Sequence, residues 1–263
     1  MSNSSLITYT RISPNRTSPR NHKIDTITIH CYVGQVTAKS GCNGSRFVKY
    51  NSKSGASCNY VVGYDGSIGL CVEEKDRSWC TSNKANDHRA ITIEVACEPV
   101  QPYRVTDKAM EALIKLCADI CKRNNISKLI WSTNKSDRVN HINGCNMTVH
   151  RDYAAKACPG EYLYNNHGYI ANEVNKLLGL NDEIVIDKIE TNSDSLYPFK
   201  VRVDISDLNI RTGAGTGYKK TGRYTGKGVF TIIDIKQGAG SKKGWGKLKS
   251  GQGWISLDYC TKV

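Results

Sequence analysis

Several features that would fix a location or a fold class are missing from the sequence. No apolar run approaches the ~18–20 residues that a membrane-spanning helix needs, so we predict no stable insertion into a membrane. The N-terminal stretch MSNSSLITYTRISPNRTSPRNHK has no apolar core of the kind found in secretory signal peptides. We therefore expect synthesis in the cytoplasm without a signal peptide, and another agent must deliver the chain to any target outside the membrane.

The chain also lacks a C-x-x-C pair, although it contains 11 cysteines. An odd count without paired spacing does not suit a secreted disulfide framework, so we interpret most of these residues as reduced thiols. Cys117 and Cys121 lie one helical turn apart, and we predict that they pack in a core.

A third absence concerns nucleic acid. The 37 basic and 24 acidic residues give a net charge of +13, which favours a polyanionic partner such as nucleic acid, anionic lipid or an acidic cell wall. No helix-turn-helix, zinc-finger or RNA-binding motif is visible, so we predict no nucleic-acid partner.

Composition divides the 263 residues into three pieces, and a chain of this length exceeds a typical single domain. Residues 1–178 mix strand-like and helix-like patterns, and residues 179–198 form an acidic linker. Residues 199–263 are rich in Gly, Lys and Thr and have no helical period. The segment 195–263 holds thirteen basic and four acidic residues, a net charge of +9, which fits a binding role.

Strands and helices interleave in the first piece. The segments 24–30 and 91–96 alternate strictly, so that rows of isoleucine would be buried and rows of polar residues exposed, with His30 and Glu94 on the same face. Asp65-Gly66 predicts a hairpin over 58–72. Apolar stripes predict helices over 107–122, with Thr106 as N-cap, and over roughly 168–178. These elements indicate an α/β layer in which helices pack on a sheet.

The clearest chemical motif is HRDYAAKACPG at residues 150–160. It places His150 and Cys158, two residue types that bind zinc well, across a short loop. A catalytic zinc usually has three protein ligands, and His30 at a strand end can supply the third. Taken singly, His30 fits a hydrogen-bonded strand histidine. Cys158 alone fits buried packing, or a nucleophile paired with His150.

Three motifs in this order resemble the N-acetylmuramoyl-L-alanine amidase type 2 family: IHCYV at 29–33, AITIEVA at 90–96 and HRDYAAKACPG. The family includes bacteriophage enzymes and is related to animal peptidoglycan recognition proteins, and the likeness spans roughly residues 5–178. It implies Zn²⁺ bound by His30, His150 and Cys158, with Glu94 as general base. Lys156 matches a lysine that assists catalysis in some members. Cys58 stands where some phage relatives carry a catalytic tyrosine.

The chemistry of these residues agrees with that resemblance. Zinc lowers the pKa of bound water to about 7 and polarises a carbonyl, a carboxylate such as Glu94 can move the proton, and an ammonium such as Lys156 can stabilise an oxyanion. Other residues receive structural interpretations: Arg151 and Asp152 brace the ligand loop, and Trp79 lines a groove or a core. The four histidines outside the motifs are taken as surface or structural: His22, His88, His141 and His167.

Residues 199–263 resemble the bacterial SH3-like domains that follow many wall hydrolases, through LNIRTGAGTGY and GWGKLKSGQGWISLDY. Such domains are small β-barrels that bind wall peptides or polymers, so we expect anionic wall polymers as partners. Four aromatic residues are candidates for binding or for the core: Trp245, Trp254, Tyr218 and Tyr259.

The sequence therefore predicts a mixed sheet flanked by helices, as in amidases and peptidoglycan recognition proteins, followed by a small all-β SH3-like barrel. The predicted function is that of an endolysin, which hydrolyses the amide between N-acetylmuramic acid and L-alanine in bacterial peptidoglycan after release from the host cytoplasm. Four alternatives stay open: a host autolysin, a non-catalytic peptidoglycan-binding protein, a cysteine peptidase and a nucleic-acid-binding protein.

Overall fold

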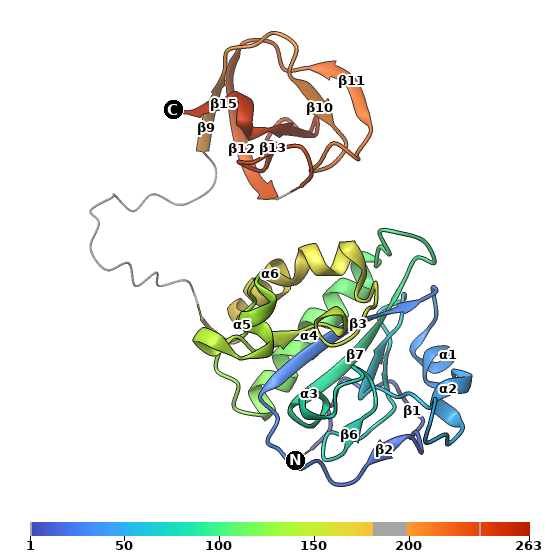
Figure 1. The fold of residues 1–263 in the computed structure, drawn as a ribbon. Coiled ribbons are helices and arrows are strands. Elements are labelled where there is room, and N and C mark those ends of the chain that lie inside the picture. The colour runs from blue at the N-terminus through green and yellow to red at the C-terminus, as the bar shows by residue number, and fades with distance from the viewer. Residues whose placement is uncertain (1, 181–198, 237) are drawn as a thin grey trace. The chain divides into compact units, whose positions relative to one another are not determined.

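A computed structural model describes residues 2–180, 199–236 and 238–263, and the chain divides into two compact units, Met1–Ile184 and Val185–Val263 (Figure 1). Each unit is described by itself. The predicted acidic linker, 179–198, falls almost wholly outside the described residues.

The first unit interleaves short strands with helices, as the sequence predicts. Its strands are β1 (Tyr9–Thr10), β2 (Arg16–Thr17), β3 (Thr26–Val33), β4 (Tyr60–Val62), β5 (Ile68–Leu70), β6 (Arg77–Ser78), β7 (Ala90–Cys97) and β8 (Met147–Thr148). Its helices are α1 (Ala38–Cys42), α2 (Ser45–Val48), α3 (Lys84–Arg89), α4 (Asp107–Arg123), α5 (Lys135–Val139) and α6 (Gly160–Leu177), with 3₁₀ turns η1 (Ile142–Gly144) and η2 (His150–Asp152).

A six-stranded mixed sheet in the order β1-β5-β4-β7-β3-β8 forms the centre of this unit. The β3, β7 and β8 strands run parallel, whereas β4 and β5 form an antiparallel hairpin. The hairpin confirms the sequence prediction. Its turn, however, has a positive φ at Gly66 alone (86°), since Asp65 keeps a negative value.

Helices α4 and α6 pack against each other and cover one face of the sheet (Figure 1). The Thr106 hydroxyl accepts a hydrogen bond from the Ala109 amide and caps α4, as predicted. Cys117 and Cys121 are fully buried in the core, and all eleven cysteines are free thiols. Helix α6 begins at Gly160, earlier than predicted, because Leu163 and His167 extend its buried stripe through a run of polar residues.

The opposite face of the sheet corrects one expectation. The polar row of β3 was expected to be exposed, but Thr26, Thr28 and His30 are completely buried. Helix α3, strand β6 and neighbouring loops cover that face, and the polar atoms bond to one another there. Thr28 Oγ1 lies 2.7 Å from Thr148 Oγ1 and accepts a hydrogen bond from Asn86 Nδ2 at 3.0 Å. Buried hydroxyls are stable here because they are paired.

The second unit is all β. Its strands are β9 (Phe199–Val203), β10 (Asn209–Arg211), β11 (Lys220–Tyr224), β12 (Gly228–Lys236), β13 (Trp245–Leu248), β14 (Trp254–Ser256) and β15 (Cys260–Lys262), with the 3₁₀ turn η3 (Leu257–Tyr259). They form one antiparallel sheet in the order β11-β10-β14-β13-β12-β9-β15. This architecture is consistent with the predicted small all-β domain.

The second unit has a small apolar core that includes Val203, Ile232 and Ile255. Trp245 and Trp254 are also buried, so of the four candidate aromatics these two are structural. Tyr259 is 57% exposed and stays available to a ligand. Alternation along β9 explains the core, because Val201 and Val203 point inward between exposed basic residues.

Candidate active site

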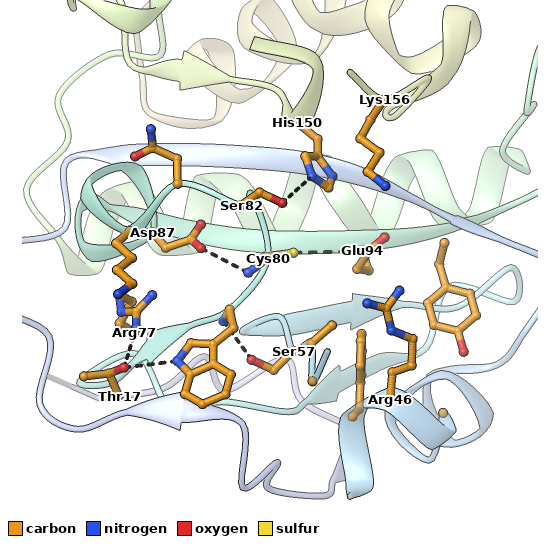
Figure 2. Close-up of a pocket in the computed structure, with 18 of the residues that line it drawn as sticks. Thr17, Arg46, Ser57, Arg77, Cys80, Ser82, Asp87, Glu94, His150 and Lys156 are labelled. Carbon is orange, nitrogen blue, oxygen red and sulfur yellow. Dashed lines mark hydrogen bonds between the residues drawn. The ribbon is translucent and has the colours of Figure 1, made fainter. Parts of the chain in front are cut away.

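A groove of about 960 Å³ lies over the ends of β3 and β7 and is walled by loops from four parts of the first unit (Figure 2). Its charged lining is mostly basic. The cations are Arg46, Lys53, Arg77, Lys84 and Lys156, and the acids are Asp87 and Glu94. Such a groove favours a substrate that carries carboxylates.

His30 lies on the sheet at the edge of this groove. Strands β3 and β7 pair in parallel with His30 opposite Glu94, which confirms that the two side chains share a face. Burial lowers the pKa of His30 well below 6.5, so the ring is neutral, the form that binds metals. Its Nδ1 is 3.4 Å from Cys158 Sγ, while its buried Nε2 has no hydrogen-bond partner among the described residues.

His150 approaches His30 from the turn η2. The two rings meet edge-on with centroids 5.1 Å apart. Burial, and secondly the charge of Lys156, lowers the pKa of His150, which again favours a neutral ring. The Ser82 hydroxyl lies 3.3 Å from His150 Nε2 (Figure 2).

A buried ion pair fixes the turn that carries His150. Arg138 binds Asp152 through Nε–Oδ2 and Nη2–Oδ1 contacts of 2.8 and 2.5 Å, and both side chains are at most 2% exposed. Asp152 Oδ2 also accepts a hydrogen bond from the Val149 amide at 3.2 Å. Arg151 donates to the Ala157 carbonyl at 2.8 Å. Arg151 and Asp152 therefore brace the loop from 150 to 160, as the sequence suggests.

Cys158 lies beside a second thiol, that of Cys31. Hydrogen bonding with Cys158 and then with Cys97 lowers the pKa of Cys31 to about 4, and the same contact with Cys31 raises the pKa of Cys158. A cation bound at Cys158 would deprotonate that thiol outright.

The ligand atoms of His30, His150 and Cys158 all lie within 4.8 Å of one another. Two neutral imidazoles and a thiol are a donor set that suits Zn²⁺. The unpartnered Nε2 of His30 shows that this buried ring is not satisfied by the protein alone. The residues present therefore fit a zinc ion.

Glu94 lies on the groove floor next to these ligands. Its Oε1 is 3.9 Å from Cys80 Sγ, and its buried Oε2 has no partner among the described residues (Figure 2). Burial, and secondly the charge of Cys31, raises the pKa of Glu94 to about 8. A carboxyl group with a pKa near neutrality can both take up and release a proton.

Lys156 comes from the loop between His150 and Cys158. Its side chain is exposed and lines the groove, where it projects toward the same space as His150 (Figure 2). Its position agrees with a group that contacts a substrate rather than a buried ligand. Trp79 also lines the groove, with its Nε1 donating to Thr17 Oγ1 at 3.0 Å.

The family model described as N-acetylmuramoyl-L-alanine amidase matches residues 20–161, more than half of the chain. The chain belongs to this family. Membership supports an N-acetylmuramoyl-L-alanine amidase activity, and amidases of this kind act on bacterial peptidoglycan. No helix among the described residues is long and apolar enough to cross a membrane.

Solved structures similar to this amidase include three that are covered over at least 90% of their own chains. PlyL shares 15% identity over 63% of this chain and 95% of its own, with a TM-score of 0.47. The selenomethionine derivative of AmpD shares 16% over 60% and 90%, with a TM-score of 0.45. The endolysin LysCS from Clostridium intestinale shares 18% over 60% and 91%, with a TM-score of 0.41. No curated protein sequence is significantly similar to the amidase.

Sequence reasoning missed much of the lining of the amidase groove, including three residues with hydroxyl or thiol groups close to the predicted site: Cys31, Cys80 and Ser82. Cys31 follows His30 directly and Cys80 follows Trp79, so adjacency was the available signal, but alternation assigned Cys31 to the other face of the strand. Cys58, which the resemblance aligned with a catalytic tyrosine of some phage relatives, is fully buried and does not line the groove. It therefore does not replace that tyrosine at the groove surface.

Proposed function

We propose that this amidase is a zinc hydrolase that cuts the amide between the lactyl group of N-acetylmuramic acid and L-alanine. The observation that supports the proposal is the meeting of His30, His150 and Cys158 from two distant segments, with Glu94 alongside. Isolated packing would not require two neutral imidazoles and a thiol to share one small space beside the groove.

The three side chains would hold the ion, and each has a clear donor. His30 and His150 are neutral because burial lowers their pKa values, and Cys158 would bind as a thiolate. Zinc bound there would supply an activated water and polarise the scissile carbonyl. The Arg138–Asp152 ion pair would keep His150 aimed at the ion.

Glu94 would accept the proton of the attacking water on its free Oε2 and pass it to the leaving amine of L-alanine. With a pKa of about 8, Glu94 is largely protonated at neutral pH in the absence of metal. A bound dication nearby would lower this pKa and favour the carboxylate, the form that accepts a proton. Lys156, on the exposed edge of the groove, would place its ammonium near the carbonyl oxygen of the substrate.

The five cations of the groove suit the carboxylates of a peptidoglycan stem peptide. We further propose that residues 199–263 form an SH3-like domain that binds anionic wall polymers, because that unit combines a net positive charge with an exposed Tyr259. The combination of an amidase unit and a wall-binding unit supports the role of an endolysin released from the host cytoplasm.

The decisive experiment is digestion of purified cell wall by the full chain. Mass spectrometry should detect new free L-alanine amino termini and no new reducing sugar ends. A chelator should abolish turnover, and Zn²⁺ should restore it. New reducing ends would identify a glycosidase, and wall binding without any turnover would identify a recognition protein.

A cysteine nucleophile is the second candidate, because Cys158 Sγ lies 3.4 Å from His30 Nδ1. Replacing Cys158 by Ser should abolish activity under either mechanism. Chelation separates them, since a cysteine peptidase retains full activity without metal and loses it on thiol alkylation. Measuring zinc content in the same samples shows whether loss of activity follows loss of metal.

A further inference from the structure

A second set of metal-binding atoms joins two residues of the groove lining, Cys80 and Glu94, to the buried His30. The ligand atoms of His30, Cys80 and Glu94 are within 4.8 Å of one another, and Cys80 Sγ lies 3.9 Å from Glu94 Oε1 (Figure 2). The proposed mechanism uses Glu94 but assigns no role to Cys80. A thiol held against a carboxyl group in a groove therefore calls for its own explanation.

These atoms are not satisfied by the protein. Glu94 Oε2 and His30 Nε2 are both buried without a hydrogen-bond partner among the described residues. Nearly all buried polar atoms in folded proteins have a partner, so two orphans at one place indicate an absent ligand. One ion at the first site would occupy the buried His30, whereas Cys80 and both oxygens of Glu94 lie outside its set of ligands, His30, His150 and Cys158.

The backbone around Cys80 is fixed in place. Its amide donates to Asp87 Oδ2 at 3.0 Å, and the next residue, Thr81, donates through its hydroxyl to Asp87 Oδ1 at 2.6 Å. Asp87 is itself 2% exposed and lies on α3. Because Cys80 is held in this way, its sulfur is positioned toward Glu94 before any ligand arrives, as a preorganised site requires.

We propose that Cys80 and Glu94 form a second metal site, which takes a further Zn²⁺ or Cd²⁺ ion and thereby inhibits the enzyme. A thiolate and a carboxylate are both zinc ligands, and the thiolate gives a preference for soft ions. His30 belongs to both sets. When it serves the first ion, the second has two protein donors and binds more weakly than the first.

Inhibition rests on the proposed function, whereas the binding of a second ion does not. An ion on Glu94 occupies the oxygens that would accept the proton of the attacking water, so turnover stops although the first site is filled. Binding requires no oxidant or reductant. The proton of the Cys80 thiol, and that of the Glu94 carboxyl group where it is present, pass to solvent as the two metal–ligand bonds form.

The test is a titration of the full chain, first freed of metal, with Cd²⁺ and in parallel with Zn²⁺. Wild type should bind two ions in two steps of different affinity. Each cadmium step should add a thiolate-to-metal absorption band, because each site contains a cysteine. In Cys80→Ser the second step should vanish or weaken by at least about tenfold, while the first remains.

Three further variants locate the ions. Cys158→Ser should weaken the first step and leave the second, which separates this proposal from the catalytic one. Cys31→Ser tests the other thiol of the groove and should leave the second step in place. Cys145→Ser, a buried thiol that does not line the groove, is the matched control and should bind as wild type does.

Activity gives an independent measurement. Wild type, Cys80→Ser and Cys145→Ser are each compared with their own activity at one equivalent of zinc, and excess zinc should inhibit wild type over the range of the second binding step. Inhibition of Cys80→Ser should require a zinc concentration about tenfold higher than inhibition of wild type.

If Cys80→Ser does not fold, Glu94→Gln serves for the binding measurement and should also lose the second step. A single equivalent in wild type, or a second step that survives in Cys80→Ser, would overturn the proposal.

Discussion

The two units of this chain place their polar and charged groups in opposite ways. The amidase unit buries them: His30, Asp87, Asp152 and Arg138 are each at most 5% exposed. In the second unit, within 199–236 and 238–263, the core is apolar and Ser256 is the buried polar residue. All thirteen basic residues within those described ranges are exposed or half-buried.

This contrast separates two kinds of function. Chemistry at a groove needs side chains held rigidly and with altered pKa values, and burial provides both. Attraction to a large anionic partner needs accessible charges, and these side chains do not have to be held rigidly. If the contrast is correct, single changes in the amidase unit should have large and local effects, whereas changes in the second unit should have small effects that add together.

The largest effect is expected at the metal ligands. His150→Ala should remove zinc and lower amide hydrolysis by about a thousandfold or more, because the catalytic group is lost rather than displaced. Turnover of a soluble muropeptide and zinc content per chain measure this. His22→Ala, at an exposed histidine of the same unit, should be neutral. Retention of both zinc and activity in His150→Ala would contradict the assignment.

Breaking the buried ion pair should have the next largest effect. Asp152→Asn leaves the Arg138 guanidinium buried without its charge partner, which typically costs about 3–5 kcal/mol. Urea unfolding should show this loss, and zinc affinity should fall as the turn carrying His150 loosens. Lys115→Gln, which removes an exposed ion pair with Glu111 on α4, should change stability by less than about 1 kcal/mol. Equal effects in the two variants would remove the distinction between buried and exposed charge.

A buried histidine should make the amidase unit sensitive to acid. Burial lowers the pKa of His167 from 6.5 to about 4, so below pH 6.5 the unfolded chain binds a proton that the folded chain does not. This contribution to stability is present above pH 6.5 and is lost as the pH falls toward 4, by about 2 kcal/mol between pH 7 and pH 5. His167→Gln should flatten the acid side of the stability profile by that amount. If the free energy of unfolding of His167→Gln falls with pH as steeply as that of wild type, His167 is protonated in the folded protein.

The sequence predicted the parts of this molecule whose causes are local. Alternation placed His30 and Glu94 on one face because the two strands pair in register, and a capping threonine marked the start of α4. The His–Cys spacing across a short loop was likewise visible. The three motifs that resemble the family, at 29–33, 90–96 and 150–160, all lie inside the residues 20–161 that the family model matches.

What the sequence could not predict depends on which segments cover which face. The polar row of β3 looked exposed, but α3 and β6 bury it, and Thr28 then bonds to Thr148 on another strand. The contact between Cys80 and Glu94 gave no signal, because the two residues are brought together only by the fold. Pairing of residues far apart in sequence is a tertiary property, and single-sequence patterns do not contain it.

The smallest effect is expected on the surface of the second unit. Replacing the exposed Lys220 and Arg223 of β11 by Glu should weaken binding to purified wall by about thirtyfold or more at low salt, since each basic residue near an anionic surface contributes about 1 kcal/mol. Cleavage of a soluble muropeptide should not change.

The matched control is Lys39→Glu with Lys128→Glu, which alters net charge equally but in the amidase unit. Raising the salt concentration should reduce the difference between wild type and the β11 variant, because exposed charges are screened. If both pairs weaken wall binding alike, total charge determines attachment, and the second unit is not the specific binding surface.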